Sequence, residues 1–354
     1  MYELTKKLKK IDSYEPIDGD FKIRLDANES CFNFNDDFGD EIAEAVKKTS
    51  LNRYPDPLAT PAVKAFSEFY GVPEKYVTAG NGSDELISII AACFLEKGDK
   101  ILTLSPDFSM YAFYSKLYEL KVEVLPKEEI YNTVNISKII DYCNTGDIKA
   151  VIFSNPCNPT SLGIKKSEIL RLIKSVFCLV IIDEAYMDFW TESVLDEVQN
   201  FDNLIVLKTC SKALGAAAIR LGFAVASDTI TNAMRAAKSP YNTDTLSQEI
   251  GKIVLSKKDY ADKNTAEIIK SREYLQKELL NLSEEFSCID KVYDSVTNFV
   301  MIKTSKGLEI YNALLKESIS VRYMGIYLRI TAGTPSENEA LVNALRKILQ
   351  SLGE

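Results

Sequence analysis

Histidine is absent from this chain of 354 residues. Its absence excludes hydrolases of the Ser-His-Asp and Cys-His kinds and zinc sites that use histidine ligands. A general base in this protein must therefore be a lysine, a carboxylate, a tyrosine or a cysteine. We expect no bound metal, and a mechanism built on lysine gains weight by elimination.

Long apolar runs and an excess of positive charge are also missing. No uninterrupted apolar stretch is long enough to span a bilayer. The basic N-terminus, Met1 to Lys10, has no apolar segment like that of a secretory signal. The formal net charge of −9 disfavours nucleic acid and anionic membranes as partners. The sequence thus predicts a protein that binds neither.

Cysteine pairs with the spacing of metal or redox motifs do not occur. The seven cysteines are scattered and odd in number, and several lie inside apolar runs. This pattern is typical of reduced, buried thiols in a cytoplasmic protein. The cysteines are Cys31, Cys93, Cys143, Cys157, Cys178, Cys210 and Cys288.

What the chain does contain is enough apolar sequence for a large core, with 46% hydrophobic and 26% charged residues. Runs such as Val151–Phe153 and Leu179–Ile182 do not alternate with polar residues, which indicates strands buried on both faces of a mainly parallel sheet. Helices over Asp84–Glu96, Lys165–Phe177 and Asp228–Lys238 would cover that sheet, giving an α/β fold. The predicted strands are Lys75–Ala79, Lys100–Leu104, Lys121–Leu125, Ala150–Ser154, Leu179–Asp183, Leu204–Lys208 and Phe223–Ala226.

The C-terminal part has a different pattern, typical of a smaller α+β domain. A long charged helix is predicted from Lys257 to Glu285, and a last helix from Ser336 to Leu352. Residues before Tyr54 show little periodicity and suggest an arm. We therefore divide the chain into an arm that contributes to the small domain (1–45), a large domain (46–255) and a small domain (256–354). The strands of the small domain are predicted at Asn298–Lys303, Ser318–Arg322 and Tyr327–Thr331.

Lys212 stands just after the predicted strand Leu204–Lys208, with Ser211 before it and Arg220 eight residues later. A partly desolvated lysine can act as a nucleophile toward a carbonyl carbon and bind it covalently. A serine hydroxyl and an arginine beside it suit a phosphate group. The combination suggests covalently held pyridoxal phosphate (PLP), although most Ser-Lys pairs are solvated surface.

A glycine-containing turn, Gly80-Asn81-Gly82-Ser83-Asp84, joins a predicted strand to a predicted helix. Backbone N–H groups at a helix N-terminus bind phosphate, and glycine permits its close approach. The same residues are also typical of ordinary N-caps, and the motif alone favours that interpretation.

Asp183 ends an apolar run, where a carboxylate needs a cationic partner. The protonated ring nitrogen of PLP is such a partner, and Tyr186 could reach the ring oxygen. A Mg²⁺-dependent nucleotide triphosphatase would also place an Asp there, but its GxxxxGK[ST] loop is absent. Asn158, in a turn stiffened by Pro156 and Pro159, could donate to the ring oxygen, although Asn-Pro is also a common turn pair.

These motifs each follow a predicted strand, and ligands of open α/β sheets bind at that edge. Their order resembles the fold-type-I PLP-dependent aminotransferases. Three further segments, Leu25–Glu29, Arg53–Pro57 and Leu328–Thr334, are similar to the histidinol-phosphate aminotransferase branch. The resemblance runs from about Tyr14 to the C-terminus. It implies a large domain with a mainly parallel sheet and a smaller C-terminal domain.

The resemblance also implies a role for individual residues. Lys212 would bind PLP covalently and later move the proton, Asp183 would pair with the ring nitrogen, and Phe108 would stack on the ring. Tyr186 and Asn158 would contact the ring oxygen. The phosphate would lie among Gly82, Ser83, Asp84, Ser211 and Arg220, with Tyr54 reaching it from the partner of a homodimer. Substrate would meet Tyr14, Asn28, Tyr54, Arg322 and Arg329, with Arg329 holding the carboxylate of the amino donor.

The chain departs from the family pattern at four places. Phe108 stands where tyrosine is usual, so the ring face is kept and a hydroxyl is lost. Ser161 and Ala218 stand where glycine is usual, which tightens the local backbone without removing a chemical group. The segment between Arg322 and Arg329 is shorter than the family's, which leaves the transamination core intact and puts the distal specificity of Arg322 in question.

The predicted reaction is a ping-pong transfer of an amino group from histidinol phosphate to 2-oxoglutarate. Aromatic or broad-range transamination and decarboxylation of a phosphorylated amino acid are alternatives on the same fold. The decarboxylase branch typically has a His-Gly pair, which a chain without histidine lacks. A PLP-binding regulator without activity is a different class, and it would lose the substrate arginine that Arg329 supplies.

Overall fold

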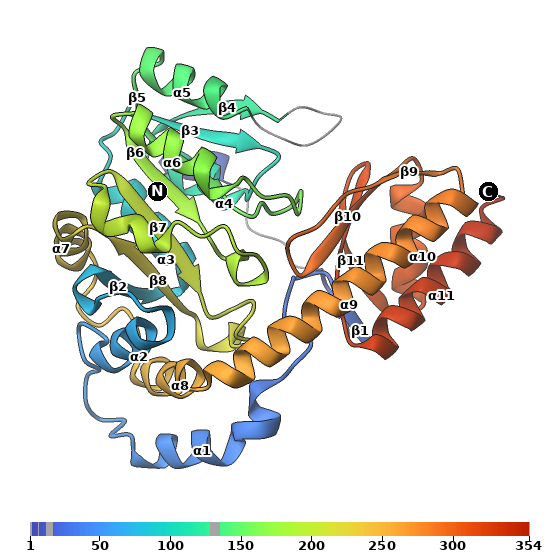
Figure 1. Cartoon of the computed structure of the whole chain (residues 1–354), viewed down its shortest axis with the longest axis horizontal. Helices are drawn as coiled ribbons and strands as arrows, with labels where there is room; N and C mark the ends of the chain where they lie inside the picture. The colour runs from blue at the N-terminus through green and yellow to red at the C-terminus, as the bar shows by residue number, and fades with distance from the viewer. Residues whose placement is uncertain (1, 6, 12–16, 128–134, 354) are drawn as a thin grey trace.

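The computed structural model describes residues 2–5, 7–11, 17–127 and 135–353. Two sheets organise the chain: a seven-stranded sheet lies in the larger, N-terminal part and a five-stranded sheet in the smaller, C-terminal part (Figure 1). The long helix α9 (Lys258–Glu285) leads from one part to the other. No helix among these residues is both long and apolar enough to cross a membrane.

The large sheet has the strand order β2-β8-β7-β6-β5-β3-β4. Its strands from β7 to β4 are parallel, whereas β8 is antiparallel to both of its neighbours. The prediction of a mainly parallel sheet is confirmed, and all seven predicted strands occur within two residues of their expected bounds. These strands are β2 (Val77–Asn81), β3 (Lys100–Ser105), β4 (Lys121–Pro126), β5 (Ile148–Ser154), β6 (Leu179–Asp183), β7 (Leu204–Thr209) and β8 (Leu221–Ala226).

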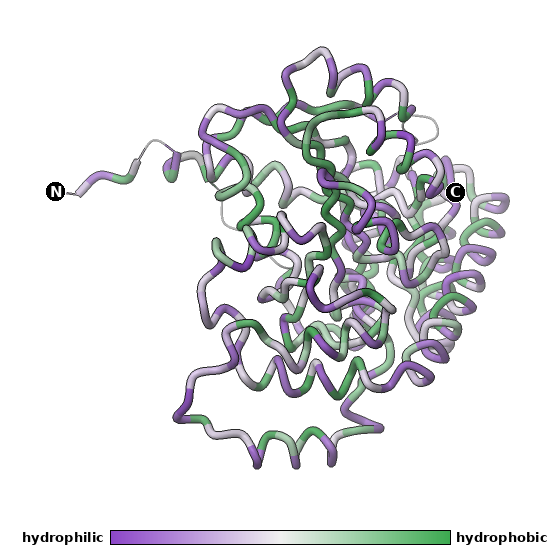
Figure 2. The backbone as a smooth tube through the Cα atoms, turned by 60° about the vertical axis from the view of Figure 1, so that its left-hand side comes forward, coloured by the Kyte–Doolittle hydropathy of each residue, from purple (hydrophilic) through white to green (hydrophobic). Residues whose placement is uncertain are grey.

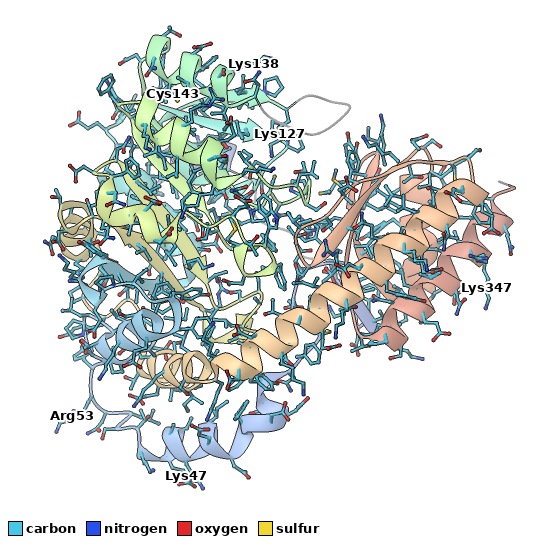
Figure 3. The ribbon with its side chains drawn as sticks, viewed as in Figure 1. Lys47, Arg53, Lys127, Lys138, Cys143 and Lys347 are labelled. Carbon is cyan, nitrogen blue, oxygen red and sulfur yellow. The ribbon has the colours of Figure 1, made fainter. Side chains whose placement is uncertain are left out.

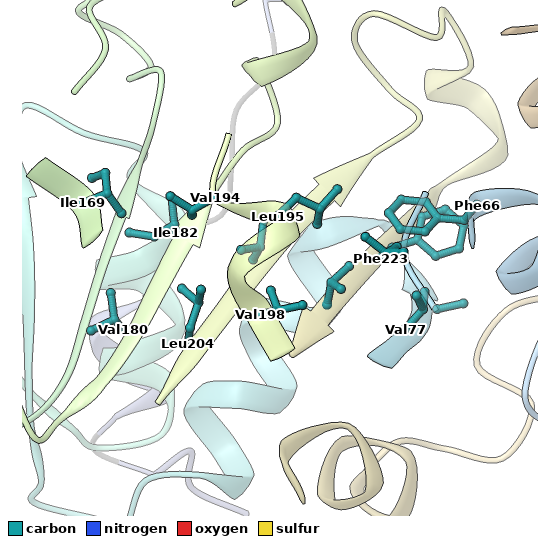
Figure 4. Packing of buried hydrophobic residues seen from close by; sticks show 14 of the residues in the cluster. Phe66, Val77, Ile169, Val180, Ile182, Val194, Leu195, Val198, Leu204 and Phe223 are labelled. Atoms are coloured by element: carbon teal, nitrogen blue, oxygen red, sulfur yellow. The ribbon is translucent and has the colours of Figure 1, made fainter. Parts of the chain in front are cut away.

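Both faces of the large sheet are covered, as its non-alternating apolar strands require. Val180 and Ile182 of β6 face one apolar cluster, and Ile181 between them faces the other. The first cluster (Figure 4) packs under α2 (Thr60–Tyr70), α5 (Ile136–Thr145), α6 (Lys166–Ser175) and α8 (Thr245–Ser256). The second packs under α3 (Gly82–Cys93), α4 (Met110–Leu117) and α7 (Asp228–Ala237).

The small sheet has the order β1-β11-β12-β10-β9. Strand β1 (Ile23–Leu25) joins it from the N-terminal end of the chain and runs parallel to β11 (Ile319–Met324). The sheet is completed by β9 (Ile289–Val292), β10 (Phe299–Thr304) and β12 (Tyr327–Thr331), and it packs against α9, α10 (Gly307–Lys316) and α11 (Pro335–Ser351). The tail thus has the helices and strands that its pattern predicts.

The segment before Tyr54 differs from expectation because it contains a 15-residue helix, α1 (Phe34–Lys48). Phe34, Phe38 and Ile42 recur at every fourth position and all three pack on the core, so the helical period is present in the sequence and the prediction of an arm overlooked it. Phe34 and Phe38 also stack on each other, and both meet the ring of Tyr260 in α9 edge-on. Tertiary packing of this apolar face stabilises the helix.

Charged side chains cover the outside of the fold. Lys47, Arg53 and Lys347 lie on the outer surfaces of both parts (Figure 3). The hydrophobic stretches of the chain run through the interior, and the first residues extend away from the body (Figure 2).

Candidate active site

A cavity of about 480 Å³ lies between the two sheets. Such a volume is typical of small-molecule sites. Twelve of the residues predicted from the sequence line it: Asn28, Ser83, Asp84, Phe108, Asn158, Asp183, Tyr186, Ser211, Lys212, Arg220, Arg322 and Arg329.

The topology explains why these residues meet. The carboxyl ends of the parallel strands β5, β6 and β7 lie at one edge of the sheet, and β2 ends at the same edge because two antiparallel pairings restore its direction. Asp183 is the last residue of β6, and Asn158 and Lys212 follow β5 and β7. The small sheet closes the cavity from the other side with β11 and β12.

Asp183 is a buried carboxylate at this edge. It accepts hydrogen bonds from the Tyr111 hydroxyl (2.8 Å) and from the backbone N–H of Ala185 (3.1 Å). Burial raises the pKa of Asp183 to about 6, although these two hydrogen bonds oppose the rise. Burial disfavours the charged form of this carboxylate, and a cation beside it would stabilise that form.

Tyr111 is a residue of the site that the sequence reasoning missed. Its ring is completely buried, and burial together with the Asp183 charge raises its pKa well above the usual value. Its position, three residues after Phe108, places both aromatic rings on one side of a helical turn, and they meet edge-on. That spacing was the signal that could have found it.

A buried ion pair supports Phe108 from behind. Asp107 accepts from the backbone N–H of Phe108 (2.8 Å) and from the Ser154 hydroxyl (2.5 Å), and the ammonium of Lys127 lies 3.5 Å from it. The Ser154 oxygen in turn accepts from the backbone N–H of Asn158 (3.1 Å). One carboxylate thus orients both the predicted stacking ring and the turn that carries Asn158.

The N-terminus of α3 points its first turn at the cavity. The helix begins at Gly82, two residues earlier than predicted, and its N-cap is Asn81, so that neither Ser83 nor Asp84 serves as the cap. First-turn N–H groups have no partner inside a helix, which makes this end suited to an anion. A Cβ on Gly82 would lie 2.7 Å from the Arg220 guanidinium, so glycine makes room for that side chain.

Arg220 and Asp84 face each other at 3.6 Å across this end of the cavity. Burial raises the pKa of Asp84, and the charges of Arg220 and Lys212 oppose the rise. The other carboxylate oxygen of Asp84 is buried without a hydrogen-bond partner among the described residues. Arg220 itself has a positive φ of 49°, a strained conformation of the kind that clusters at functional sites.

Lys212, Arg329 and Tyr186 all contact one short turn, Asp26 to Asn28. The Lys212 ammonium donates to the Ala27 carbonyl (2.9 Å), and the Arg329 guanidinium donates to the Asp26 carbonyl (2.6 Å). The Asn28 amide donates to the Tyr186 hydroxyl (2.9 Å). The sequence placed Asn28 in the site but gave no sign of this arrangement, because its partners are far away along the chain.

Arg322 and Arg329 stand directly opposite each other on the hairpin of β11 and β12. Arg329 also donates to the Asn158 side-chain oxygen (2.5 Å). The short segment between the two arginines is a tight turn at Gly325 (φ 70°), which keeps both strands paired up to Met324. The shortened loop therefore leaves the two arginines side by side at the cavity.

Gly82 and Tyr54 are predicted site residues that do not line this cavity. Tyr54 is 80% exposed and stacks on the ring of Tyr241, with 4.5 Å between the ring centroids. Tyr14 lies outside the described residues.

Ser161, at a position where the resemblance leads us to expect glycine, has a φ of 61°, and its hydroxyl donates to the Asp294 carbonyl.

Comparison with known proteins agrees with the geometry. The chain matches the model of the family "Aminotransferase class I and II" over residues 21–345. The chain belongs to this family. The motif resemblance and the predicted fold are thereby confirmed.

Among its relatives within the class I and II aminotransferases, the histidinol-phosphate aminotransferase of Clostridium novyi is 40% identical over 96% of both chains. That of Pyrococcus furiosus is 33% identical over 96% of both. A solved histidinol-phosphate aminotransferase from Sinorhizobium meliloti, in complex with pyridoxal-5'-phosphate, has the same fold, with a TM-score of 0.88, 19% identity and 99% coverage of both chains.

Metal chemistry finds no support in the described part of the chain, where no group of three or more histidine, cysteine or acidic side chains could hold an ion. The prediction of no bound metal stays a prediction.

Proposed function

We propose that this protein is a PLP-dependent aminotransferase that transfers the amino group of histidinol phosphate to 2-oxoglutarate. The observation that carries the proposal is one cavity in which Lys212, the buried carboxylate of Asp183 and the Arg220 guanidinium converge. The 40% identity to a histidinol-phosphate aminotransferase over nearly the whole chain supports the substrate.

The residues around the cavity fit PLP at both of its ends. Asp183 would hold the protonated ring nitrogen, since burial penalises its charge and a cationic partner relieves that penalty. The N-terminus of α3, Ser211 and Arg220 would hold the phosphate. Phe108 would cover one face of the ring, and the side chains of Tyr186 and Asn158 would contact the ring oxygen.

When bound, PLP supplies an electron sink for the negative charge left on the amine-bearing carbon. Lys212 would be the proton carrier, because its ammonium group reaches the cavity on a flexible stem. Arg329 and Asn158 are joined by a hydrogen bond that leaves the Asn158 amide N–H groups available to a ligand. The hydrogen bond from Tyr111 would favour the ionised form of Asp183. Strands β11 and β12 of the small sheet would exclude water from their side of the cavity.

The opposed pair of Arg322 and Arg329 suits substrates that carry anionic groups. Like charges placed directly opposite on a sheet repel each other, and a phosphate or carboxylate between them relieves the repulsion. Histidinol phosphate bears its phosphate near the amine, where glutamate bears a carboxylate. One pair of guanidinium groups can therefore anchor both substrates of a ping-pong cycle.

A homodimer is part of the proposal. Tyr54 is exposed and does not line the cavity of its own chain, and its exposed aromatic pair with Tyr241 is suited to a partner subunit's site. Leu51 and Leu58, both exposed, lie in the same segment and would be covered by that partner.

The seven cysteines are all free thiols, which supports a reducing compartment such as the cytoplasm.

The test is the absorption spectrum of the purified protein with PLP, recorded before and after each amino donor is added. We expect a visible band that histidinol phosphate removes, and that 2-oxoglutarate then restores. Removal only by phenylalanine or tyrosine would replace the substrate with an aromatic one, and carbon dioxide release would indicate a decarboxylase. A band that no donor changes would indicate an inactive regulator, and no band at all would refute PLP binding.

A further inference from the structure

The turn from Asp26 to Asn28 follows β1 of the small sheet and hydrogen-bonds to Lys212 and Tyr186, which both line the cavity. Asn28 is 1% exposed and adopts a left-handed conformation with a φ of 54°. Its backbone carbonyl accepts from the Asn298 amide (3.1 Å), so the residue is held at both its backbone and its side chain. Asparagine tolerates this conformation better than most residues do.

The hydrogen bonds around Asn28 favour one orientation of its side-chain amide. The Asn28 backbone N–H donates to the Thr331 hydroxyl oxygen (3.0 Å), so the Thr331 proton must point elsewhere. The acceptor found for it among the described residues is the Asn28 side-chain oxygen, 3.1 Å away, and a turned amide would leave this buried hydroxyl proton without a partner. The amide NH₂ group of Asn28 therefore faces the Tyr186 hydroxyl oxygen, at 2.9 Å.

An amide NH₂ group can only donate, and a tyrosine hydroxyl has a single proton. Because Tyr186 accepts from Asn28, its own proton cannot be given to Asn28. It is left for a group in the cavity, which Tyr186 lines.

We propose that Thr331 and Asn28 are positioning residues that aim the Tyr186 proton into the cavity, toward the ring oxygen of the cofactor. This inference rests on the proposed function, because it needs PLP in the cavity. It gives Asn28 a role different from the substrate contact that the resemblance implies. It also adds Thr331, which lies on the same strand as Arg329 and two residues from it, to the residues that serve the site.

The pH at which the visible band of the PLP-loaded protein changes reports the direction of this proton. A hydrogen bond donated to the ring oxygen stabilises its anionic form and lowers the pKa of the bound cofactor. A hydrogen bond to a charged group contributes enough to move that pKa by about 1 to 2 pH units. The charged groups that face the cavity, and that the variants leave in place, are Asp26, Glu29, Asp84, Asp107, Asp183, Lys212, Arg220, Arg322 and Arg329.

Thr331→Val removes the hydroxyl at nearly constant volume and adds no charge. The Asn28 amide is then free to turn its oxygen toward Tyr186 and accept the proton. We expect the pKa of the band to rise, and Thr331→Ser, which keeps the hydroxyl, to restore it. Asn28→Asp places an acceptor beside Tyr186 outright and should raise the pKa further.

Thr304→Val is the matched control. Thr304 is buried in the same sheet, on β10, and its hydroxyl oxygen accepts only from the backbone N–H of Lys306 among the hydrogen bonds found for it. It should lower the melting temperature about as much as Thr331→Val does, without moving the pKa of the band. A double-mutant cycle with Tyr186→Phe completes the test. In that background Thr331→Val should have no further effect.

Two failures are distinguishable. A wild-type protein that gains no visible band with PLP overturns the proposed function and this inference with it. A wild-type protein with a titrating band, whose pKa stays within about 0.2 pH units in Thr331→Val and Asn28→Asp, overturns this inference alone. An equal rise in Thr304→Val, or a full effect of Thr331→Val without Tyr186, would also overturn it.

Discussion

Replacing Tyr111 by phenylalanine removes one of the two hydrogen-bond donors that the structure gives to Asp183 and leaves the ring in place. A hydrogen bond to a charged group contributes about 1.5 to 3 kcal/mol, which corresponds to about 1 to 2 pH units. Burial already raises the pKa of Asp183 to about 6. We therefore expect the variant's Asp183 to titrate at about pH 7 to 8 in the cofactor-free protein.

The consequence for stability has a definite sign. The folded-state pKa of Asp183 lies above its unfolded value, so the folded state binds more protons between the two values, and the free energy of unfolding falls as the pH rises. In the wild type this fall is complete soon above pH 6. In the variant it continues to about pH 8, which costs a further 1.5 to 3 kcal/mol or so.

The assay is urea unfolding of the cofactor-free protein at pH 5 and pH 8. The difference between variant and wild type should be about 1.5 to 3 kcal/mol larger at pH 8 than at pH 5. Comparing the two pH values cancels any constant packing loss. Tyr142→Phe is the control, because the Tyr142 hydroxyl also donates to a carboxylate, that of Glu123, but at the surface. Parallel loss of stability in wild type and Tyr111→Phe would refute the reasoning.

Three further predictions concern the cavity. Lys212→Ala should abolish both the visible band and turnover, and normal turnover in this variant, measured with saturating PLP, would contradict the assignment. Arg329→Ala should raise KM for every amino donor by about 10- to 100-fold, since it removes a bidentate anchor worth a few kcal/mol; a selective loss for one donor would mean that Arg329 recognises side chains. Gly82→Ala should displace the Arg220 guanidinium, which would lie 2.7 Å from the new Cβ, and weaken PLP binding; equilibrium dialysis that finds unchanged affinity would exclude this crowding.

The strands of the large sheet could be predicted because their signal is local. Runs such as Leu179–Asp183 are apolar at every position, and only a strand covered on both faces accommodates such a run. The motifs at the strand ends then converge because parallel strands share an edge. The orientation of β8 could not be predicted in this way, since an apolar strand looks the same in either direction.

For helix α1 the sequence contains the period but not the partner. Phe34, Phe38 and Ile42 recur at every fourth position, whereas the ring of Tyr260, more than 200 positions later, meets Phe34 and Phe38 only in the folded chain. Tyr111 is similar: its sequence neighbours do not reveal that its hydroxyl meets Asp183, 72 residues away.

The sequence by itself determined the chemistry of the site, because the amine of a lysine, the carboxylate of an Asp after an apolar run and the free N–H groups of a helix that starts with glycine are given by residue type and local pattern. Which groups orient them was decided by the tertiary structure. Asn28 and Tyr186 are separated by 158 residues and Asn28 and Thr331 by 303, and hydrogen-bond direction exists only once folding brings such pairs within about 3 Å.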